Sequence, residues 1–312
     1  MKQANNVLVK ISKMYRMRGY YIAEILISLV LGAIIVASLL SLTFAGWKTY
    51  LTITSYSSTS DLTRVAFSFL DSQLSLAGYR AKAWELSGNV FPALPASAGN
   101  YPAFAAGQTL SAQDVGGNTV LYIRKQGGLQ NDSYNAGTGI FTPPAYDLIA
   151  DTRIRDCTGS FIPNQAIIIE KYSINATNQL VCQRVYVRPF DASVPTYIAV
   201  TAANSSVIME YVVAARARFG VGDIVGDRDT AGLPPARRTA AQITSPTNRW
   251  SSVMSVEYGL VVGKFDDKNL SNKTDRTVKL FGRTIAVRPT RGSPGNYATA
   301  FTQIITLRNR MY

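Results

Sequence analysis

A single carboxylate interrupts the most apolar part of this chain. Between Tyr20 and Gly46 the only charged residue is Glu24. A carboxylate in an apolar helix costs up to a few kcal/mol and usually marks a partner or a pathway. Cleavage between Gly19 and Tyr20 would expose an α-amino group four residues before Glu24, about 6 Å away along a helix. The spacing therefore predicts that such an amine would neutralise Glu24, within one chain or between neighbours.

The scarcity of metal-binding residues excludes several classes of enzyme. Histidine is absent, and the only cysteines are Cys157 and Cys182. These counts remove most transition-metal ligands and the imidazole of acid and base catalysis, so we expect no enzyme and no cofactor. A cysteine pair in an exported region indicates a disulfide, with two buried free thiols as the alternative. Such a bridge would stabilise the fold by roughly 3 to 3.5 kcal/mol.

A glycine-rich loop at 220–230 contains three acids, Asp223, Asp227 and Asp229. Carboxylate and carbonyl oxygens of this kind are calcium ligands. An EF-hand beginning at Asp227 fails, because Arg238 occupies the twelfth place, where a bidentate glutamate is needed. A solvated acidic turn is the favoured interpretation, and these three residues remain a weak calcium candidate.

The basic charge of the chain does not indicate a nucleic-acid partner. The formal net charge is +13, but the lysines and arginines are spread along the sequence rather than gathered in a stripe. Arg237, Arg238 and Trp250 could contact an anion, yet no aromatic and basic repeat accompanies them. We therefore expect no specific nucleic-acid partner.

The apolar run that contains Glu24 is predicted to be a membrane anchor. A helix over 20–46 is long enough to cross a hydrocarbon core of about 30 Å. Basic residues without any acid precede it, which predicts a cytoplasmic N-terminus and an exported remainder; they are Lys2, Lys10, Lys13, Arg16 and Arg18. A cleaved signal peptide ending at 43–45 is an alternative, but its leader would be unusually long and would contain Glu24. Glu24 could also snorkel to the headgroups.

The stretch from Arg18 to Glu24, a basic leader ending in Gly19 followed by an aromatic residue and then glutamate, resembles the signal of type IV pilins and pseudopilins. The resemblance implies cleavage between Gly19 and Tyr20 by prepilin peptidase, N-methylation of Tyr20, and packing of the helix into a filament core. The usual first mature residue is phenylalanine, and Tyr20 is a mild departure from it.

Three further stretches resemble the PilW group of minor pilins: 70–80, 156–182 with its two cysteines, and 307–310. This resemblance implies other minor pilins, a major pilin, prepilin peptidase and an inner-membrane assembly platform as partners. It also implies a bacterial inner membrane location with an exported C-terminal domain, followed by the periplasm and the cell-surface pilus.

The fold class expected from the whole chain is α+β, with a long N-terminal helix packed on a strand-rich antiparallel head domain. We expect a leader over 1–19, a helix over 20–78 with its membrane part over 20–46, and a head over 79–312 that has room for two subdomains. Gly78 is a natural helix end, and 87–118 is expected to be a surface excursion. Three- and four-residue spacing predicts the packed helix face, comprising Leu62, Val65, Ala66, Phe69, Leu70, Leu74 and Ala77. Alternation predicts strands at 119–124, 166–172, 180–187, 206–213, 252–262 and 277–287.

The function predicted from these observations is that of a minor type IV pilin, a low-copy subunit that primes or tips the filament. Two alternatives stay open. A pseudopilin of a type II secretion system would share the anchor, and a membrane-anchored exported enzyme or ligand-binding protein would have an unprocessed N-terminus and a pocket with convergent polar groups.

Overall fold

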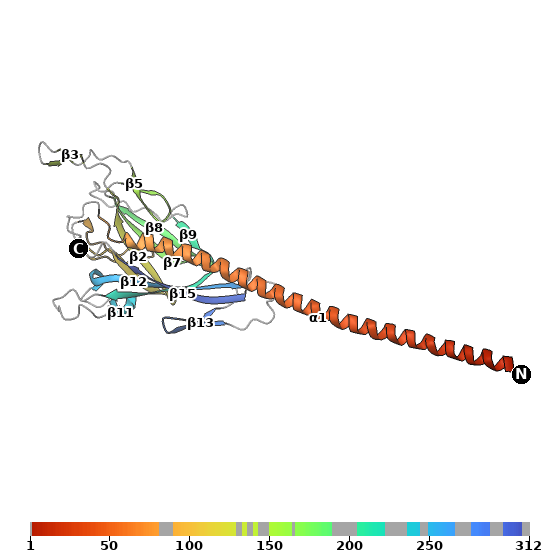
Figure 1. Ribbon diagram of the computed structural model, residues 1–312. Coiled ribbons are helices and arrows are strands. Elements are labelled where there is room, and N and C mark those ends of the chain that lie inside the picture. Colours follow the sequence, from red (N-terminus) through yellow and green to blue (C-terminus); the bar gives the residue numbers. More distant parts are fainter. Residues whose placement is uncertain are drawn as a thin grey trace, which may run out of the picture. The chain divides into compact units, whose positions relative to one another are not determined.

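The computed structural model of the 312-residue chain describes most of the sequence in ordered elements. The described residues are 2–80, 90–128, 133–135, 140–142, 150–163, 166–188, 205–221, 236–243, 249–265, 276–287 and 296–307. They form two compact units, Met1–Ser57 and Ser58–Tyr312. Figure 1 labels the helix and the strands.

The N-terminal element is one helix, α1, which spans Lys2–Ser75. It includes the expected leader and continues through the serine- and threonine-rich stretch at 52–60. Hydroxyl groups within α1 donate to the carbonyl oxygen one turn back, as Ser38 Oγ does to Ile34 O at 2.8 Å, so these polar side chains are satisfied by the helix itself.

The chain leaves α1 through a turn that ends at Gly78. The φ of Gly78 is 79°, a left-handed conformation that favours glycine because it has no Cβ. Its N–H donates to Arg124 O at 2.8 Å, and a Cβ on it would lie 3.1 Å from Thr109 Oγ1. The helix ends at Ser75, three residues before the predicted end at Gly78, and glycine is needed at 78 both for the backbone and for the close contact.

Two antiparallel sheets make up most of the head. The five-stranded sheet has the order β1-β2-β7-β8-β9, formed by Leu110–Val115, Asn118–Gln126, Ile167–Ile174, Leu180–Arg188 and Ser205–Met209. The four-stranded sheet has the order β11-β10-β12-β15, formed by Ala236–Arg238, Val212–Val221, Val253–Phe265 and Asn296–Thr306.

Smaller elements complete the described head. Three two-stranded pairs accompany the sheets: β3 with β4 (Ser133–Asn135, Ile140–Thr142), β5 with β6 (Ala150–Arg155, Phe161–Pro163), and β13 with β14 (Arg276–Leu280, Arg283–Val287). A short helix α3 (Ala240–Ile243) and a 3₁₀ turn (Arg249–Ser252) precede β12.

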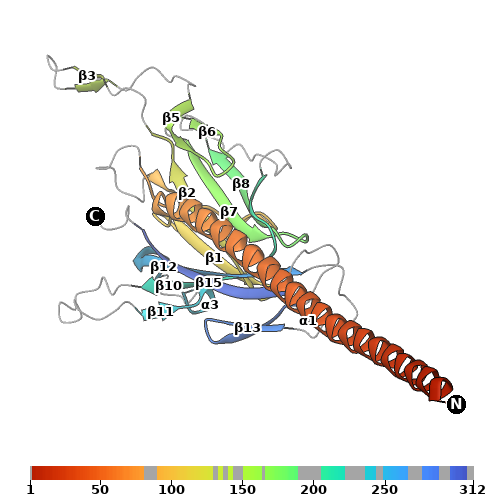
Figure 2. The same cartoon turned by 45° about the vertical axis from the view of Figure 1, so that its right-hand side comes forward.

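The main hydrophobic core lies where the last turns of α1 meet both sheets. In Figures 1 and 2 these turns pass over strands of the five-stranded sheet, and β12 and β15 lie below them in the views. Leu70 and Leu74 of α1 are buried in the same cluster as Leu121 of β2 and Tyr258 of β12. A long helix packed on an antiparallel, strand-rich head confirms the predicted α+β fold class.

The helix face predicted to pack on the head is only partly right. Ala66, Leu70 and Leu74 are buried, as expected. Leu62 and Val65 are instead 54% and 67% exposed, because the sheets cover a narrower stripe of α1 than the apolar spacing suggests. The exposed pair leaves apolar surface on the head half of the helix.

The glycine- and proline-rich stretch at 87–118 is not a surface excursion where the structure describes it. Phe91, Tyr101 and Phe104 are buried, and the end of the stretch forms β1. Two predicted strands are each divided. The 206–213 prediction covers β9 and the start of β10, and 277–287 is a hairpin that turns at Phe281 and Gly282, both of which have positive φ.

Removal of a buried leucine from α1 should destabilise the head. We predict that Leu70→Ala lowers the free energy of unfolding by about 2 to 5 kcal/mol, through lost burial and the cavity left behind. Val65→Ala, on the exposed side of the same helix, should change it by less than about 0.5 kcal/mol. Urea titration of the full-length protein in detergent, followed by tryptophan fluorescence, measures both. Equal midpoints for the two variants would contradict the packing of α1.

Candidate functional site

The first half of α1 presents a continuous apolar surface. Tyr21–Tyr50 is long and apolar enough to cross a membrane, by length and composition, and none of it is buried. Exposed apolar surface of this extent does not persist in water and marks a membrane or protein contact. This segment is the candidate assembly site.

Glu24 lies in this apolar surface, one turn from the predicted cleavage position. Its side chain is exposed, and among the described residues no ion pair involves it. Its backbone carbonyl accepts a hydrogen bond from Ser28 Oγ at 2.8 Å. For Gly19 and Tyr20 the structure describes only a helical backbone, so the four-residue separation from Tyr20 to Glu24 corresponds to about 6 Å along the axis.

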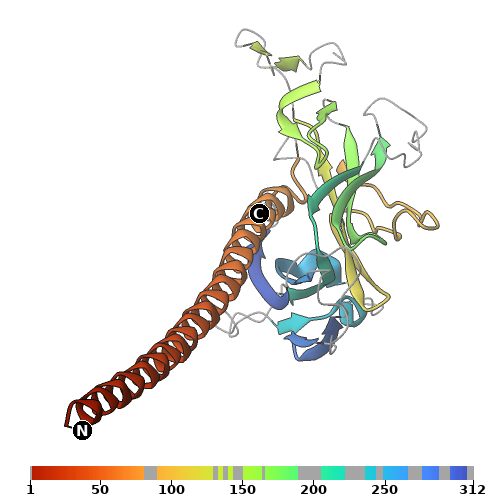
Figure 3. The ribbon, with the colours of Figure 1, turned by 90° about the vertical axis from the view of Figure 1, so that its right-hand side faces the viewer.

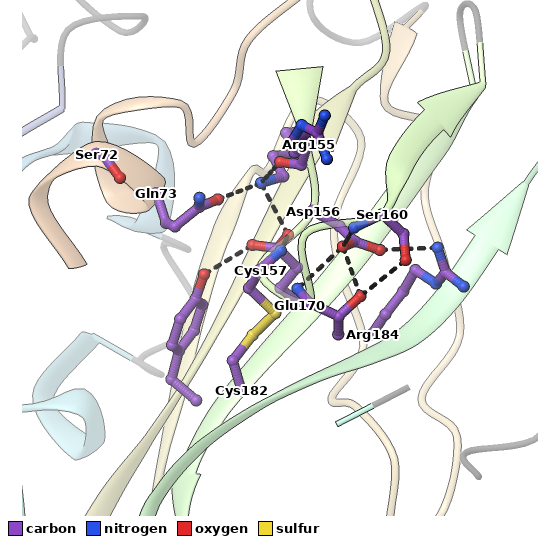
Figure 4. Close-up of polar contacts among 12 residues, drawn as sticks. Ser72, Gln73, Arg155, Asp156, Cys157, Ser160, Glu170, Cys182 and Arg184 are labelled. Carbon is purple, nitrogen blue, oxygen red and sulfur yellow. Dashed lines mark hydrogen bonds and ion pairs between the residues drawn. A yellow bond between two sulfur atoms is a disulfide. The ribbon is translucent and has the colours of Figure 1, made fainter. Parts of the chain in front are cut away.

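A buried polar cluster fastens the other end of α1 to the head. We call it the junction cluster and define it as Gln73, Lys125, Cys157, Glu170 and Tyr172. Lys125 Nζ lies 2.8 Å from Glu170 Oε1, and neither side chain has any exposed surface. Lys125 also donates to Gln73 Oε1 of α1 at 2.5 Å. Figure 4 shows the labelled Gln73, Cys157 and Glu170 of this cluster.

The Glu170 carboxylate is satisfied on both oxygens. Cys157 N donates to Oε1 at 2.7 Å, and Tyr172 Oη donates to Oε2 at 2.7 Å. Burial first, and then the neighbouring Glu170 charge, raise the pKa of Tyr172 well above its ordinary value, so the phenol keeps its proton and remains a donor. A buried ion pair needs such additional hydrogen bonds to offset its desolvation. The junction cluster is therefore a structural device rather than a reactive one.

Next to this cluster the predicted disulfide between Cys157 and Cys182 is formed, with Cα atoms 6.1 Å apart. It joins the turn after β5 to β8. In the chain-entropy account, a loop of 25 residues gives about 3.5 kcal/mol of stabilisation. The two sulfurs lie close to a Glu170 oxygen, but disulfide sulfurs are not the thiolates that bind metals.

The turn that carries Cys157 is ordered by Asp156. Asp156 Oδ1 accepts hydrogen bonds from Thr158 N at 2.9 Å and Ser160 N at 2.8 Å. Its other oxygen pairs with Arg184 Nη1 of β8 at 2.7 Å. These contacts hold the turn over the junction cluster, and Asp156, Ser160 and Arg184 are labelled in Figure 4.

The remaining candidate residues are not brought into one site. Asp223, Asp227 and Asp229 lie outside the described residues, so their calcium hypothesis stays a prediction. Trp250 is buried, with its ring 5.0 Å from that of Phe219, and therefore presents no aromatic surface to a ligand.

The sequence reasoning missed Lys125 and Glu170. Glu170 follows three isoleucines in the stretch Ile167–Tyr172, and a charge after such a run is the signal that could have found it. Lys125 stands between Arg124 and Gln126, so its sequence neighbours give no such signal. Antiparallel pairing of β2 and β7 brings the strands of Lys125 and Glu170 side by side.

In the described chain an apolar N-terminal helix continues into a head of antiparallel sheets. Residues 168–309 match the family model described as type IV pilus-assembly protein W, PilW. The predicted resemblance to the PilW group is confirmed. The match supports a pilin-related role, but it does not include Gly19, Tyr20 or Glu24.

Two other comparisons were made. A search of curated proteins gives no match. Among solved structures, a type IV-like pilin from Thermus thermophilus is 11% identical; the match covers 81% of this chain and 97% of that one, with a TM-score of 0.37.

The ion pair of the junction cluster can be tested by removing its partners singly and together. We predict that Lys125→Met lowers the free energy of unfolding by about 3 to 5 kcal/mol, because Glu170 is then left charged and buried. The double variant Lys125→Met with Glu170→Met should recover most of this loss. The measurement is urea unfolding of the full-length protein in detergent. Simple additivity of the two single losses would show that the groups are not coupled.

Proposed function

We propose that this protein is a minor type IV pilin that takes part in pilus assembly as a low-copy subunit of the filament or of its tip. The observation that carries the proposal is a lone carboxylate, Glu24, in an exposed apolar helix, four residues after the Gly19–Tyr20 bond. The match of 168–309 to the PilW family also supports a role in the type IV pilus.

The proposed maturation step is hydrolysis of the Gly19–Tyr20 peptide bond by prepilin peptidase. It removes the leader 1–19 and leaves a helix that begins at Tyr20 and ends at Ser75, followed by the head. The new α-amino group of Tyr20 is a cation and, after N-methylation, remains one. It lies at the end of the apolar run, next to Glu24 in the helix.

The proposed assembly step is lateral association of apolar helices with neutralisation of Glu24. Apolar contacts alone do not fix the axial position of one helix against another. Lipid tails are as apolar as the side chains, so a shift along the axis exchanges one apolar contact for another. A buried carboxylate does fix that position, because leaving it unpaired in an apolar setting costs up to a few kcal/mol. The amine of Tyr20 in the same or a neighbouring subunit is the proposed partner.

The proposed location follows from this step. The subunit is held in the bacterial inner membrane with its head exported, and it then enters the filament. Its proposed partners are other minor pilins, the major pilin, prepilin peptidase and the inner-membrane assembly platform. The basic segment before Tyr20 supports this orientation, and the disulfide supports an oxidising compartment for the head.

The mass of the mature protein tests processing. We expect a chain that begins at Tyr20 and carries one methyl group on its amine, because the proposed peptidase cleaves after Gly19. Intact-mass and N-terminal peptide spectrometry of the protein from its native membrane measures this. A mature chain that begins at Met1 or at Gly46 contradicts the proposal.

Substitution of Glu24 tests the assembly step. We expect Glu24→Ala to insert in the membrane normally but to reach the filament about tenfold less, equivalent to roughly 1.4 kcal/mol of lost pairing. Ser28→Ala is the matched control, since it changes a neighbouring side chain that bonds only a backbone carbonyl. Immunoblots of membranes and of sheared pili give the two amounts. Incorporation of Glu24→Ala at the wild-type level would contradict the proposed neutralisation of Glu24 during assembly.

A further inference from the structure

The outer edge of β15 lacks the sequence features with which proteins usually protect sheet edges. Short strands, charged residues, prolines and bulges all discourage pairing with another chain. β15 runs over eleven residues, Asn296–Thr306, without a charged residue or a proline. It pairs with β12 along its whole length without a register shift. In the described part of the chain its other side has no partner strand.

The other three sheet edges differ from β15. β11 has three residues, two of which are Arg237 and Arg238. β9 has five residues, and β1 has six, with Asp114 near its end. Long, uncharged and unbulged edge character is thus confined to β15 among the edges of the two sheets that the structure describes.

A groove runs between this edge and α1. Its volume is about 410 Å³, and its lining includes Ser60, Arg64, Ser68, Asp71, Thr302 and Gln303. Both sides of the groove belong to the unit Ser58–Tyr312. Figure 3 shows β15, in dark blue, beside the helix.

The polar side chains of the groove have unused capacity for bonding. Within the described part of the chain neither Arg64 nor Asp71 forms an ion pair. The two charges are seven residues apart on α1, hence about 10 Å along its axis. An extended chain rises about 3.4 Å per residue and its side chains alternate between two faces, so the same-face spacing nearest to this span is four residues of a strand in the groove.

We propose that the edge of β15 and the facing side of α1 receive an extended segment of a different exported subunit, which adds as a further strand to the four-stranded sheet. The main-chain groups of β15 would bond the backbone of the segment. Arg64 and Asp71 would pair with an acid and a base four residues apart, on the same face of it. Strand addition of this kind draws affinity from the backbone and specificity from side chains.

A second copy of this chain is a poorer occupant. Two copies that paired their β15 strands antiparallel about a two-fold axis would place the 58–75 segments of α1 in opposite directions. The proposed assembly instead packs helices whose heads are all on the exported side of one membrane. The inference deepens the proposed function, because the partner would be a neighbouring subunit of the same assembly. It requires neither cleavage after Gly19 nor Glu24.

The test uses a peptide that has the inferred chemistry. The probe has nine residues of alternating threonine and valine, except for one glutamate and one lysine four residues apart on the same face, and it carries a fluorescent label. Anisotropy with the full-length protein in detergent measures binding, and hydrogen exchange measures protection of the β15 amides. We expect saturable binding and added protection in β15.

Two sets of variants make the result specific. Thr302→Lys, at an exposed position of the edge, should weaken binding at least tenfold. Val207→Lys is the control, since Val207 is 49% exposed on the edge strand β9 and should leave binding unchanged. The charge swap Arg64→Asp with Asp71→Arg should weaken binding of the first peptide and restore it for a peptide whose glutamate and lysine are exchanged.

Several outcomes would overturn the inference. The first is absence of saturable binding. The second is equal binding by Thr302→Lys and by the wild type, provided that the two proteins unfold at the same urea midpoint. The third is failure of the exchanged peptide to recover affinity for the charge-swap variant. Self-association of the chain in detergent that Thr302→Lys abolishes would replace the partner by a second copy. Since the peptide assay needs no processing, its failure leaves the Glu24 mechanism intact, and unprocessed or unincorporated protein leaves the strand-addition result intact.

Discussion

A lysine and a glutamate with no exposed surface meet where α1 joins the head, and this ion pair constrains everything around it. Desolvation of two charges costs several kcal/mol for each, and their attraction offsets this only when every remaining donor and acceptor is satisfied. Here the satisfying groups come from α1, β2, β7 and the turn after β5. The pair is thus stable only when four separate elements are in place together, and it fixes the rotation of α1 through Gln73.

The disulfide belongs to the same constraint. The turn that holds Cys157 supplies a backbone donor to Glu170, and the bond to Cys182 ties that turn to β8. The ion pair between Asp156 and Arg184 ties the same turn to β8 a second time. Formation of the Cys157–Cys182 disulfide therefore helps to hold the turn in place. Through the turn it also supports the junction cluster that attaches α1 to the head. An exported head, as the basic N-terminal segment predicts, is a setting in which such a bond persists.

The sequence was informative where one physical rule dominates. Hydrophobicity and length identified the apolar segment of α1, and alternation found β2, β7, β8 and β12 to within a few residues. The sequence was less informative where elements distant in the chain decide whether a side chain is buried. Leu62 and Val65 have the spacing of a packed face but lack a sheet above them, and Phe91 is buried although it lies in a stretch of glycine, proline and alanine. Lys125 and Glu170 are distant in the chain, and their pairing follows from the register of β2 with β7, which single-strand patterns do not contain.

In the proposed assembly, one part of this chain would supply the attraction between subunits and other parts would supply the selection among them. The apolar half of α1 can pack on many helices of similar composition, because dispersion and hydrophobic contacts have little direction. Selection among subunits therefore has to come from directional groups, which either pair or are left unsatisfied. The chain offers these in two places: Glu24 within the apolar helix, and the backbone edge of β15 with Arg64 and Asp71 beside it. A carboxylate can set axial position but cannot tell one subunit from another that carries the same amine. In the proposed assembly, discrimination among neighbours would then rest on the head, where a single substitution in an edge strand can permit or block pairing.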